Sequence, residues 1–196
     1  MMKLLPFFLF LAFTTPDFQA QSPYLPVPAG WRVEQFPFPI EFAPQIPYSG
    51  DEHLRFAPTW DKLDSDESWA YCFLWWIKLD SKMRSESLEK DLQAYYAGLV
   101  GRNITRRKID QSLVVPTITE FKETVTEKGD NKTYGGTIKM LDYMSLRPVT
   151  LHVRVYQMLC TKENKMAVFF AVSPQPQSHA IWGQFKMVRE GFQCSK

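Results

Sequence analysis

The sequence is poor in the residues that build metal and redox sites. It has only 3 cysteines and 3 histidines in 196 residues, and no CxxC pair. Because metal sites need several such ligands at short spacing, the sequence predicts no metal site and no cofactor. It also lacks HExxH, a glycine-rich phosphate loop and a dinucleotide fingerprint, so common cofactor chemistry is not indicated by any motif.

An excess of one charge is lacking as well. The 23 basic and 21 acidic residues leave a formal net charge of +2. Nucleic-acid-binding domains carry a marked positive excess, so we expect no nucleic-acid partner. The basic run Arg102, Arg106, Arg107 and Lys108 is predicted to lie in a loop after a helix, where solvation is favoured over contact with anionic lipid.

Long hydrophobic runs are missing after the first one, which directly follows Lys3 and covers residues 4–13. This run is too short to cross a bilayer, which takes about 20 apolar residues. A basic start followed by a short apolar run is typical of a secretory signal peptide. We therefore expect a signal peptide over residues 1–20, a cut near Ala20 and Gln21, and an exported protein, periplasmic or extracellular, without a transmembrane segment after cleavage.

Export would permit one disulfide among Cys72, Cys160 and Cys194, with three possible pairings. Cys72 lies in an apolar strand pattern, where a free cysteine behaves as a small hydrophobic residue. The pair Cys160 and Cys194 is therefore favoured. The alternative is that all three thiols are reduced and buried.

Aromatic residues are abundant, and they extend into a proline-rich segment. The chain is 45% hydrophobic and 15% aromatic, which favours one domain with a dense core. Residues 23–48 contain seven prolines, which exclude a helix or a central strand there. We expect an extended arm over residues 21–52 that lays aromatic side chains on a domain spanning 53–196. The alternative is a proline-rich ligand for a partner protein.

Part of this segment resembles a known group of proteins. Residues 30–58, with GWRVEQFPFPIEFAP at the start and LRFAP at the end, resemble an uncharacterised family of exported bacterial domains. The resemblance implies an exported single domain and supplies no catalytic residues.

Residues 69–79 carry the strongest strand pattern. Its alternate positions are apolar on both faces, which predicts a strand covered on both sides. A shorter strand is expected at 54–57. Residues 84–100 have the apolar spacing of a helix, with Gly101 as its expected end.

The second half of the chain predicts a meander. Strands are expected at 117–127, 133–142, 149–160 and 166–173, followed by a helix at 179–191. The order β-β-α-β-β-β-β-α predicts an α+β fold with a single antiparallel β-sheet and two main helices packed against it, preceded by the proline-rich arm. By element order alone, this fold is similar to the PsbP-like sandwich.

The candidate binding residues lie on the polar face of that sheet. Thr150, His152, Arg154 and Tyr156 alternate with apolar residues, and the neighbouring strand adds Lys139. Arginine and lysine there could receive a carboxylate or phosphate, with Tyr156 as a flat platform. The alternative is an ordinary solvated sheet face.

Catalytic patterns are weak. Ser178 and His179 are adjacent, which does not suit a triad, and Glu120, Glu123 and Glu127 are expected on one exposed strand. We therefore expect an exported, non-catalytic binding or accessory domain of unknown ligand. Its partner would be an envelope or extracellular protein or a small molecule. The alternative is an exported, cofactor-independent hydrolase that uses scattered acids or His152.

Overall fold

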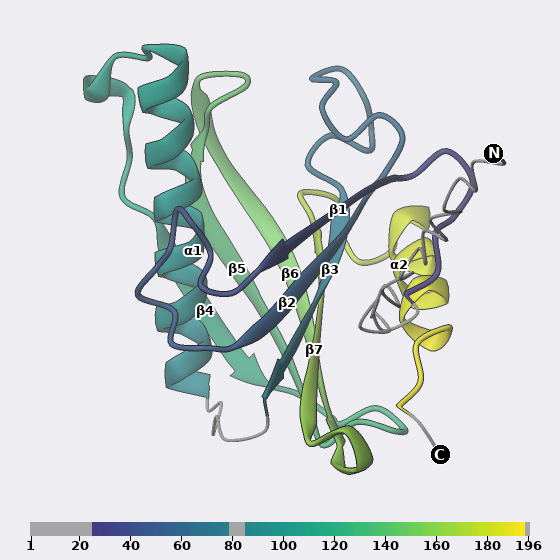
Figure 1. Ribbon diagram of the computed structural model, residues 1–196. Helices are drawn as coiled ribbons and strands as arrows, with labels where there is room; N and C mark the ends of the chain where they lie inside the picture. The colour runs from purple at the N-terminus through teal and green to yellow at the C-terminus, as the bar shows by residue number, and fades with distance from the viewer. Residues whose placement is uncertain (1–24, 79–84, 195–196) are drawn as a thin grey trace, which may run out of the picture.

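The protein forms one antiparallel sheet with a helix on each face (Figure 1). The computed structural model describes residues 25–78 and 85–194. The predicted α+β class and element order are confirmed, and one further strand precedes them. The predicted signal peptide lies outside the described residues.

The elements occur in the following order along the chain. The first three strands are β1 (Arg32–Pro37), β2 (Gly50–Phe56) and β3 (Tyr71–Lys78). Helix α1 (Ser85–Arg107) and the short 3-10 helix η1 (Gln111–Leu113) follow. The remaining elements are β4 (Ile118–Glu123), β5 (Lys132–Asp142), β6 (Arg147–Cys160), η2 (Thr161–Glu163), β7 (Lys165–Ser173) and α2 (Ala180–Glu190). The strand order in the sheet is β1-β2-β3-β7-β6-β5-β4.

Strand β3 has two apolar faces, as predicted. Tyr71, Phe73 and Trp75 belong to the core on the α1 side. Cys72 and Leu74 belong to the core on the α2 side. Both sets are at least 97% buried, so a single strand supplies both hydrophobic layers and fixes the middle of the sheet.

The described part of the predicted arm is built into the sheet. Its strand β1 pairs with β2 and lies at the sheet edge, where a proline-rich segment is tolerated. After β1, Ile40 and Ile46 are buried in the α1-side core, whereas Leu25 and Trp31, before it, are buried in the α2-side core. Strand β2 already begins at Gly50, inside the predicted arm. The arm therefore covers both faces of one fold.

Helix α1 ends later than predicted. The expected end at Gly101 is wrong, because the helix continues to Arg107. Ile104 is 2% exposed and extends the apolar stripe by one more turn. The helix ends where Lys108 adopts a positive φ of 54° and the Ile109 N–H donates to the Ile104 carbonyl at 3.1 Å. This is the helix ending usually built on glycine.

The later end of α1 also moves the basic run. Arg102, Arg106 and Arg107 lie on the last turns of the helix, and only Lys108 follows it, so the predicted loop position is wrong. Cations are favoured there because the carbonyl end of a helix carries partial negative charge. The helix holds these side chains in fixed directions, which a loop would not do.

Helix α2 begins at a histidine cap. His179 Nδ1 accepts a hydrogen bond from the Ile181 N–H at 3.3 Å, which gives His179 a structural role. Ile181, Phe185 and Val188 are buried against the sheet.

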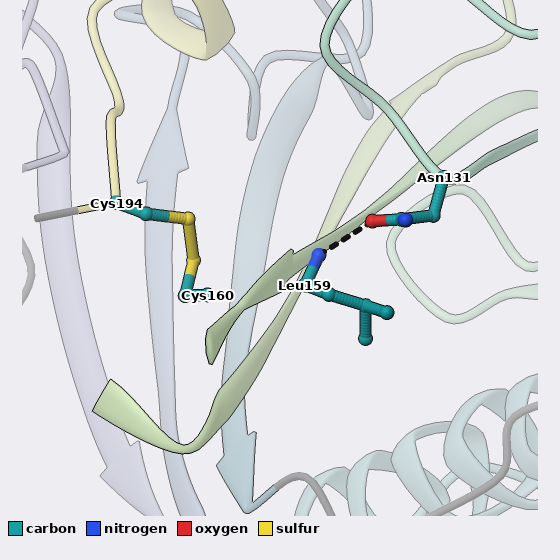
Figure 2. Close-up of a disulfide and its surroundings, with 4 residues drawn as sticks. All are labelled: Asn131, Leu159, Cys160 and Cys194. Carbon is teal, nitrogen blue, oxygen red and sulfur yellow. Dashed lines mark hydrogen bonds between the residues drawn. A yellow bond between two sulfur atoms is a disulfide. The ribbon is translucent and has the colours of Figure 1, made fainter. Parts of the chain in front are cut away.

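A disulfide ties the segment after α2 to the end of β6 (Figure 2). It joins Cys160 and Cys194, the pair favoured from the sequence, with a Cα–Cα distance of 5.3 Å. Beside it, the Leu159 N–H donates to Asn131 Oδ1 at 2.7 Å, which fixes the β4–β5 connection to β6. Cys72 is a buried free thiol, and burial raises its pKa well above the usual range.

Candidate functional site

The four candidate binding residues share one face of the sheet. They are Lys139, His152, Arg154 and Tyr156. In the β5–β6 register, Thr137 lies opposite His152 and Lys139 lies opposite Thr150. Arg154 and Tyr156 follow His152 at alternate positions of β6, on the α2 side. The register thus brings Lys139 and His152 to neighbouring positions.

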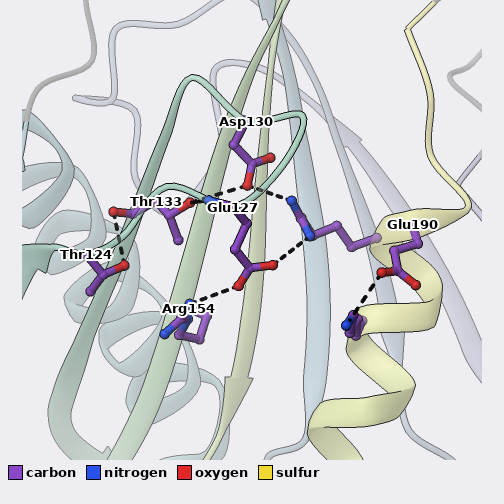
Figure 3. A network of polar contacts seen from close by, with 8 residues as sticks. Thr124, Glu127, Asp130, Thr133, Arg154 and Glu190 are labelled. Carbon is purple, nitrogen blue, oxygen red and sulfur yellow. Dashed lines mark hydrogen bonds and ion pairs between the residues drawn. The ribbon is translucent and has the colours of Figure 1, made fainter.

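Two members of this patch, Arg154 and Tyr156, are already engaged within the chain. Figure 3 shows the contact of Arg154 with Glu127. Glu127 binds Arg154 at 3.0 Å and Arg189, on α2, at 3.1 Å. Arg189 also binds Asp130 at 2.6 Å, and its guanidinium lies 4.1 Å from the ring centre of Tyr156. These contacts fasten α2 to the sheet, so we assign Arg154 and Tyr156 to a structural network.

A small cavity of about 210 Å³ lies beside this network, between the sheet and α2. Arg154, Tyr156 and Trp182 are among its lining residues, whereas Lys139 and His152 are not. The predicted patch therefore does not converge on one cavity.

The acids of the hydrolase alternative are also separated. Strand β4 ends at Glu123, so the prediction of Glu120, Glu123 and Glu127 on one strand is wrong. Glu123 pairs with Lys132 at 2.9 Å, whereas Glu127 belongs to the network with Arg154 and Arg189. Each of these two acids is therefore held by basic neighbours.

A larger cavity of about 350 Å³ opens on the other face of the sheet, beside α1. Six segments line it: β1, β2, the loop carrying Phe42, the stretch from Trp60 to Tyr71, the second half of α1 and the turn after β5. Eight of its 17 lining residues are aromatic: Phe36, Phe42, Phe56, Trp60, Trp69, Tyr71, Tyr95 and Tyr143. Their rings suit a flat ligand body.

Two of the cavity arginines are on α1. The Arg102 guanidinium lies 4.4 Å from the ring centre of Phe42, and that of Arg107 lies 5.1 Å from that of Tyr143. Arg107 Nη1 also donates to the Tyr143 carbonyl at 3.4 Å. Across the described residues, neither arginine has a carboxylate within ion-pair distance.

The third arginine is on β1. Arg32 pairs with Glu34 at 3.5 Å, and its guanidinium lies 5.0 Å from the ring centre of Phe56 and 4.9 Å from that of Trp60. Its charge is thus compensated on its own strand.

Several donors around this cavity lack partners. Trp60 Nε1, Trp69 Nε1 and Arg102 Nε are buried and have no acceptor among residues 25–78 and 85–194. A buried unpaired donor costs about 1–3 kcal/mol. All three atoms belong to residues that line this cavity.

The backbone at Trp69 is strained. Its φ is 56°, which is unusual for a bulky side chain, and the residue is 2% exposed. The Trp69 N–H donates to the Trp60 carbonyl at 2.8 Å, so the two indoles are held beside the same cavity. Strain of this kind is concentrated at functional sites.

A buried carboxyl lies below the aromatic wall. Glu52, on β2, accepts hydrogen bonds from Trp75 Nε1 at 2.9 Å and Tyr95 Oη at 3.3 Å. Burial raises the Glu52 pKa to about 7, although these two hydrogen bonds lower it. Glu34 raises the pKa further, and Arg102 lowers it. Tyr95 therefore connects the cavity to a carboxyl that can be neutral near pH 7.

The described residues contain no cluster of three or more metal-ligating side chains. The acidic turn around residues 61–67 is organised by Glu67, which accepts from Thr59 Oγ1 at 2.7 Å.

No helix in the described part of the chain is long and apolar enough to cross a membrane.

Comparison with known proteins gives no match to a protein-family model, a curated protein or a solved structure. The argument for function therefore depends on the cavities and side chains of this chain.

Sequence reasoning missed the larger cavity, because its residues come from distant segments without a shared motif. One signal was available. Arg32, Glu34 and Phe36 occupy alternate positions, which would place them on one face of a strand. A second signal was the continuation of the α1 stripe to Ile104, which would have placed Arg102 and Arg107 on a helix.

Proposed function

We propose that this protein is an exported, non-catalytic binding domain that holds a small molecule with a flat apolar body. The ligand would occupy the cavity between the β1–β2 edge of the sheet and α1, in place of the predicted polar patch. Its volume of about 350 Å³ lies within the range of small-molecule sites. The observation that carries the proposal is this cavity, in which aromatic residues from six segments line the same space as three arginines.

The hydrolase alternative has less support. His152 lies on the α2 face of the sheet, whereas the larger cavity opens on the other face. The Glu52 carboxyl already accepts two hydrogen bonds within the core. A catalytic acid or base must reach the reacting atom within hydrogen-bond distance. We therefore favour binding.

A fluorescent neutral probe tests the cavity. Phenylnaphthylamine, which is flat and uncharged, is expected to bind and brighten on transfer from water into the aromatic site. Leu99→Trp places an indole in the cavity lining and should weaken this binding at least about tenfold, because the ring occupies the ligand's space.

Ala97→Trp is the matched control, because it adds the same ring at an exposed position of α1. It should leave probe affinity unchanged. A wild-type protein that does not bind the probe, or equal binding by Leu99→Trp, would contradict a cavity-binding function.

Export is tested separately. Full-length chain produced in a bacterial host should appear outside the cytoplasm with a new N-terminus near Gln21, as read by N-terminal sequencing or intact mass. Replacing Leu9 and Leu11 with arginine should keep the chain in the cytoplasm with its original N-terminus, because it interrupts the apolar run. Recovery of an uncut wild-type chain from the cytoplasm would contradict export.

A further inference from the structure

We propose that the ligand of the larger cavity carries an anionic group, and that Arg102 and Arg107 hold this group while the aromatic walls hold its flat body. This inference rests on the proposed function and adds the chemical class of the ligand. It depends on the distribution of charge around the cavity and on the two arginines of α1.

The charges at the cavity are unevenly paired. Arg32 is matched by Glu34, and Arg106, which follows on the same helix, is matched by Glu41 at 3.9 Å. Arg102 and Arg107 have no such match among the described residues, although both line the cavity. Asp61, the other acid of the lining, lies 3.9 Å from Lys62. The α1 wall of the cavity therefore carries uncompensated positive charge.

Arg102 is already held in a binding geometry. Its guanidinium lies over the Phe42 ring, and its Nε donor is buried without a partner within the described chain. Stacking on a ring leaves the two Nη nitrogens in the guanidinium plane, where they match the two oxygens of a carboxylate, phosphate or sulfonate. Arg107 uses one nitrogen for the Tyr143 carbonyl and retains other donors.

The same region favours a flat ligand body. Trp60 and Trp69 contribute aromatic residues to the cavity lining. An aromatic molecule with an acidic group offers ring surface to these walls and oxygen atoms to Arg102 and Arg107. A purely apolar ligand would leave both arginines without a counter-charge.

Arg102 and Arg107 also pack against aromatic rings, so the test must separate anion binding from packing. Two matched probes do this. Anilinonaphthalene sulfonate and phenylnaphthylamine share the same ring system, and only the first has a negative charge. We expect the wild-type protein to bind the sulfonate at least about tenfold more tightly than the neutral probe, as charge-assisted hydrogen bonds to two arginines would produce.

Arginine variants then assign the charge. Arg102→Gln and Arg107→Gln should each weaken sulfonate binding about tenfold and leave neutral-probe binding within about twofold. Arg106→Gln is the control, because it removes the same charge from the same helix at a position outside the cavity lining. Arg102→Lys, which keeps the charge without the planar donor edge, should fall between the wild type and Arg102→Gln. A variant with an altered near-ultraviolet circular dichroism spectrum is replaced by its methionine counterpart, which also removes the charge and keeps a long side chain for packing.

Competition identifies the type of anion. Benzoate and phenyl phosphate are tested for displacement of the sulfonate probe, and the stronger competitor shows whether the site prefers a carboxylate or a phosphate. Displacement by neither would contradict the inference.

The outcomes distinguish the two proposals. Equal affinity of the wild type for both probes, or equal loss in Arg106→Gln and Arg102→Gln, would overturn the anionic ligand and leave cavity binding standing. Failure of both probes to bind would overturn the proposed function itself.

Discussion

Gly98→Ala is expected to destabilise the protein by about 3 kcal/mol or more, because α1 and the loop after β1 touch at this glycine. A Cβ at position 98 would overlap the carbonyl oxygen of Phe42 and lie 2.8 Å from its carbonyl carbon. Both clashing atoms belong to backbone, so no side-chain rotation relieves the contact. The loop is also fastened to α1 by Tyr48 Oη, which donates to Asp91 Oδ2 at 2.5 Å.

Gly101→Ala supplies the control on the same helix. A Cβ there meets nothing within 4 Å, so the change should stabilise the protein by about 0.5–1 kcal/mol through helix propensity. Urea unfolding of the two variants measures the difference. Equal stability of Gly98→Ala and the wild type would show that the loop does not rest on α1. Because Phe42 lines the cavity, Gly98→Ala should also weaken binding of the neutral probe.

Glu52→Gln is expected to remove a pH dependence of stability. The Glu52 pKa rises from 4.5 to about 7 in the folded protein, so the folded state binds this proton more tightly than the unfolded chain. Stability from this group is therefore full below about pH 4.5, falls as the pH rises toward 7, and is level above that. The total loss is up to about 3 kcal/mol, because each pKa unit corresponds to about 1.4 kcal/mol.

Glutamine resembles the protonated carboxyl and can bond to both Trp75 and Tyr95. Glu52→Gln should therefore match the wild type near pH 4.5 and exceed its stability at pH 8 by up to about 3 kcal/mol. Urea unfolding at a series of pH values measures this difference. Glu120→Gln removes an exposed carboxyl of β4 that is not among the groups shifting the Glu52 pKa, and it is the control. A difference between Glu52→Gln and the wild type that is the same at both pH values would contradict the assignment.

The sheet was predictable because its signals are local. Alternation in residues 69–79 fixed the two faces of β3, and turns between the later strands fixed the antiparallel meander. Strand β1 was hidden by its prolines, which mark an edge strand and an irregular arm equally well. What decides between these two is pairing with β2, which no local pattern reports.

The end of α1 shows how packing overrides a local signal. Gly101 has the residue type of a helix end, but Ile104 gains more by burial than the glycine loses in propensity. This error had a consequence for function, because it moved Arg102 and Arg107 into a loop and away from the aromatic walls. The cavity itself was beyond prediction, since Arg32, Trp60 and Tyr143 meet only after the chain has folded.

Strand β7 joins the three N-terminal strands to the strands that follow α1, because it lies between β3 and β6 in the sheet. It pairs with β3 on one side, Tyr71 opposite Val172, and with β6 on the other. Until residues as far as Ser173 have been synthesised, the first three strands lack this neighbour, and Phe73 has no Phe170 to stack on. The cavity is therefore built on a sheet that stays incomplete until β7 has been synthesised.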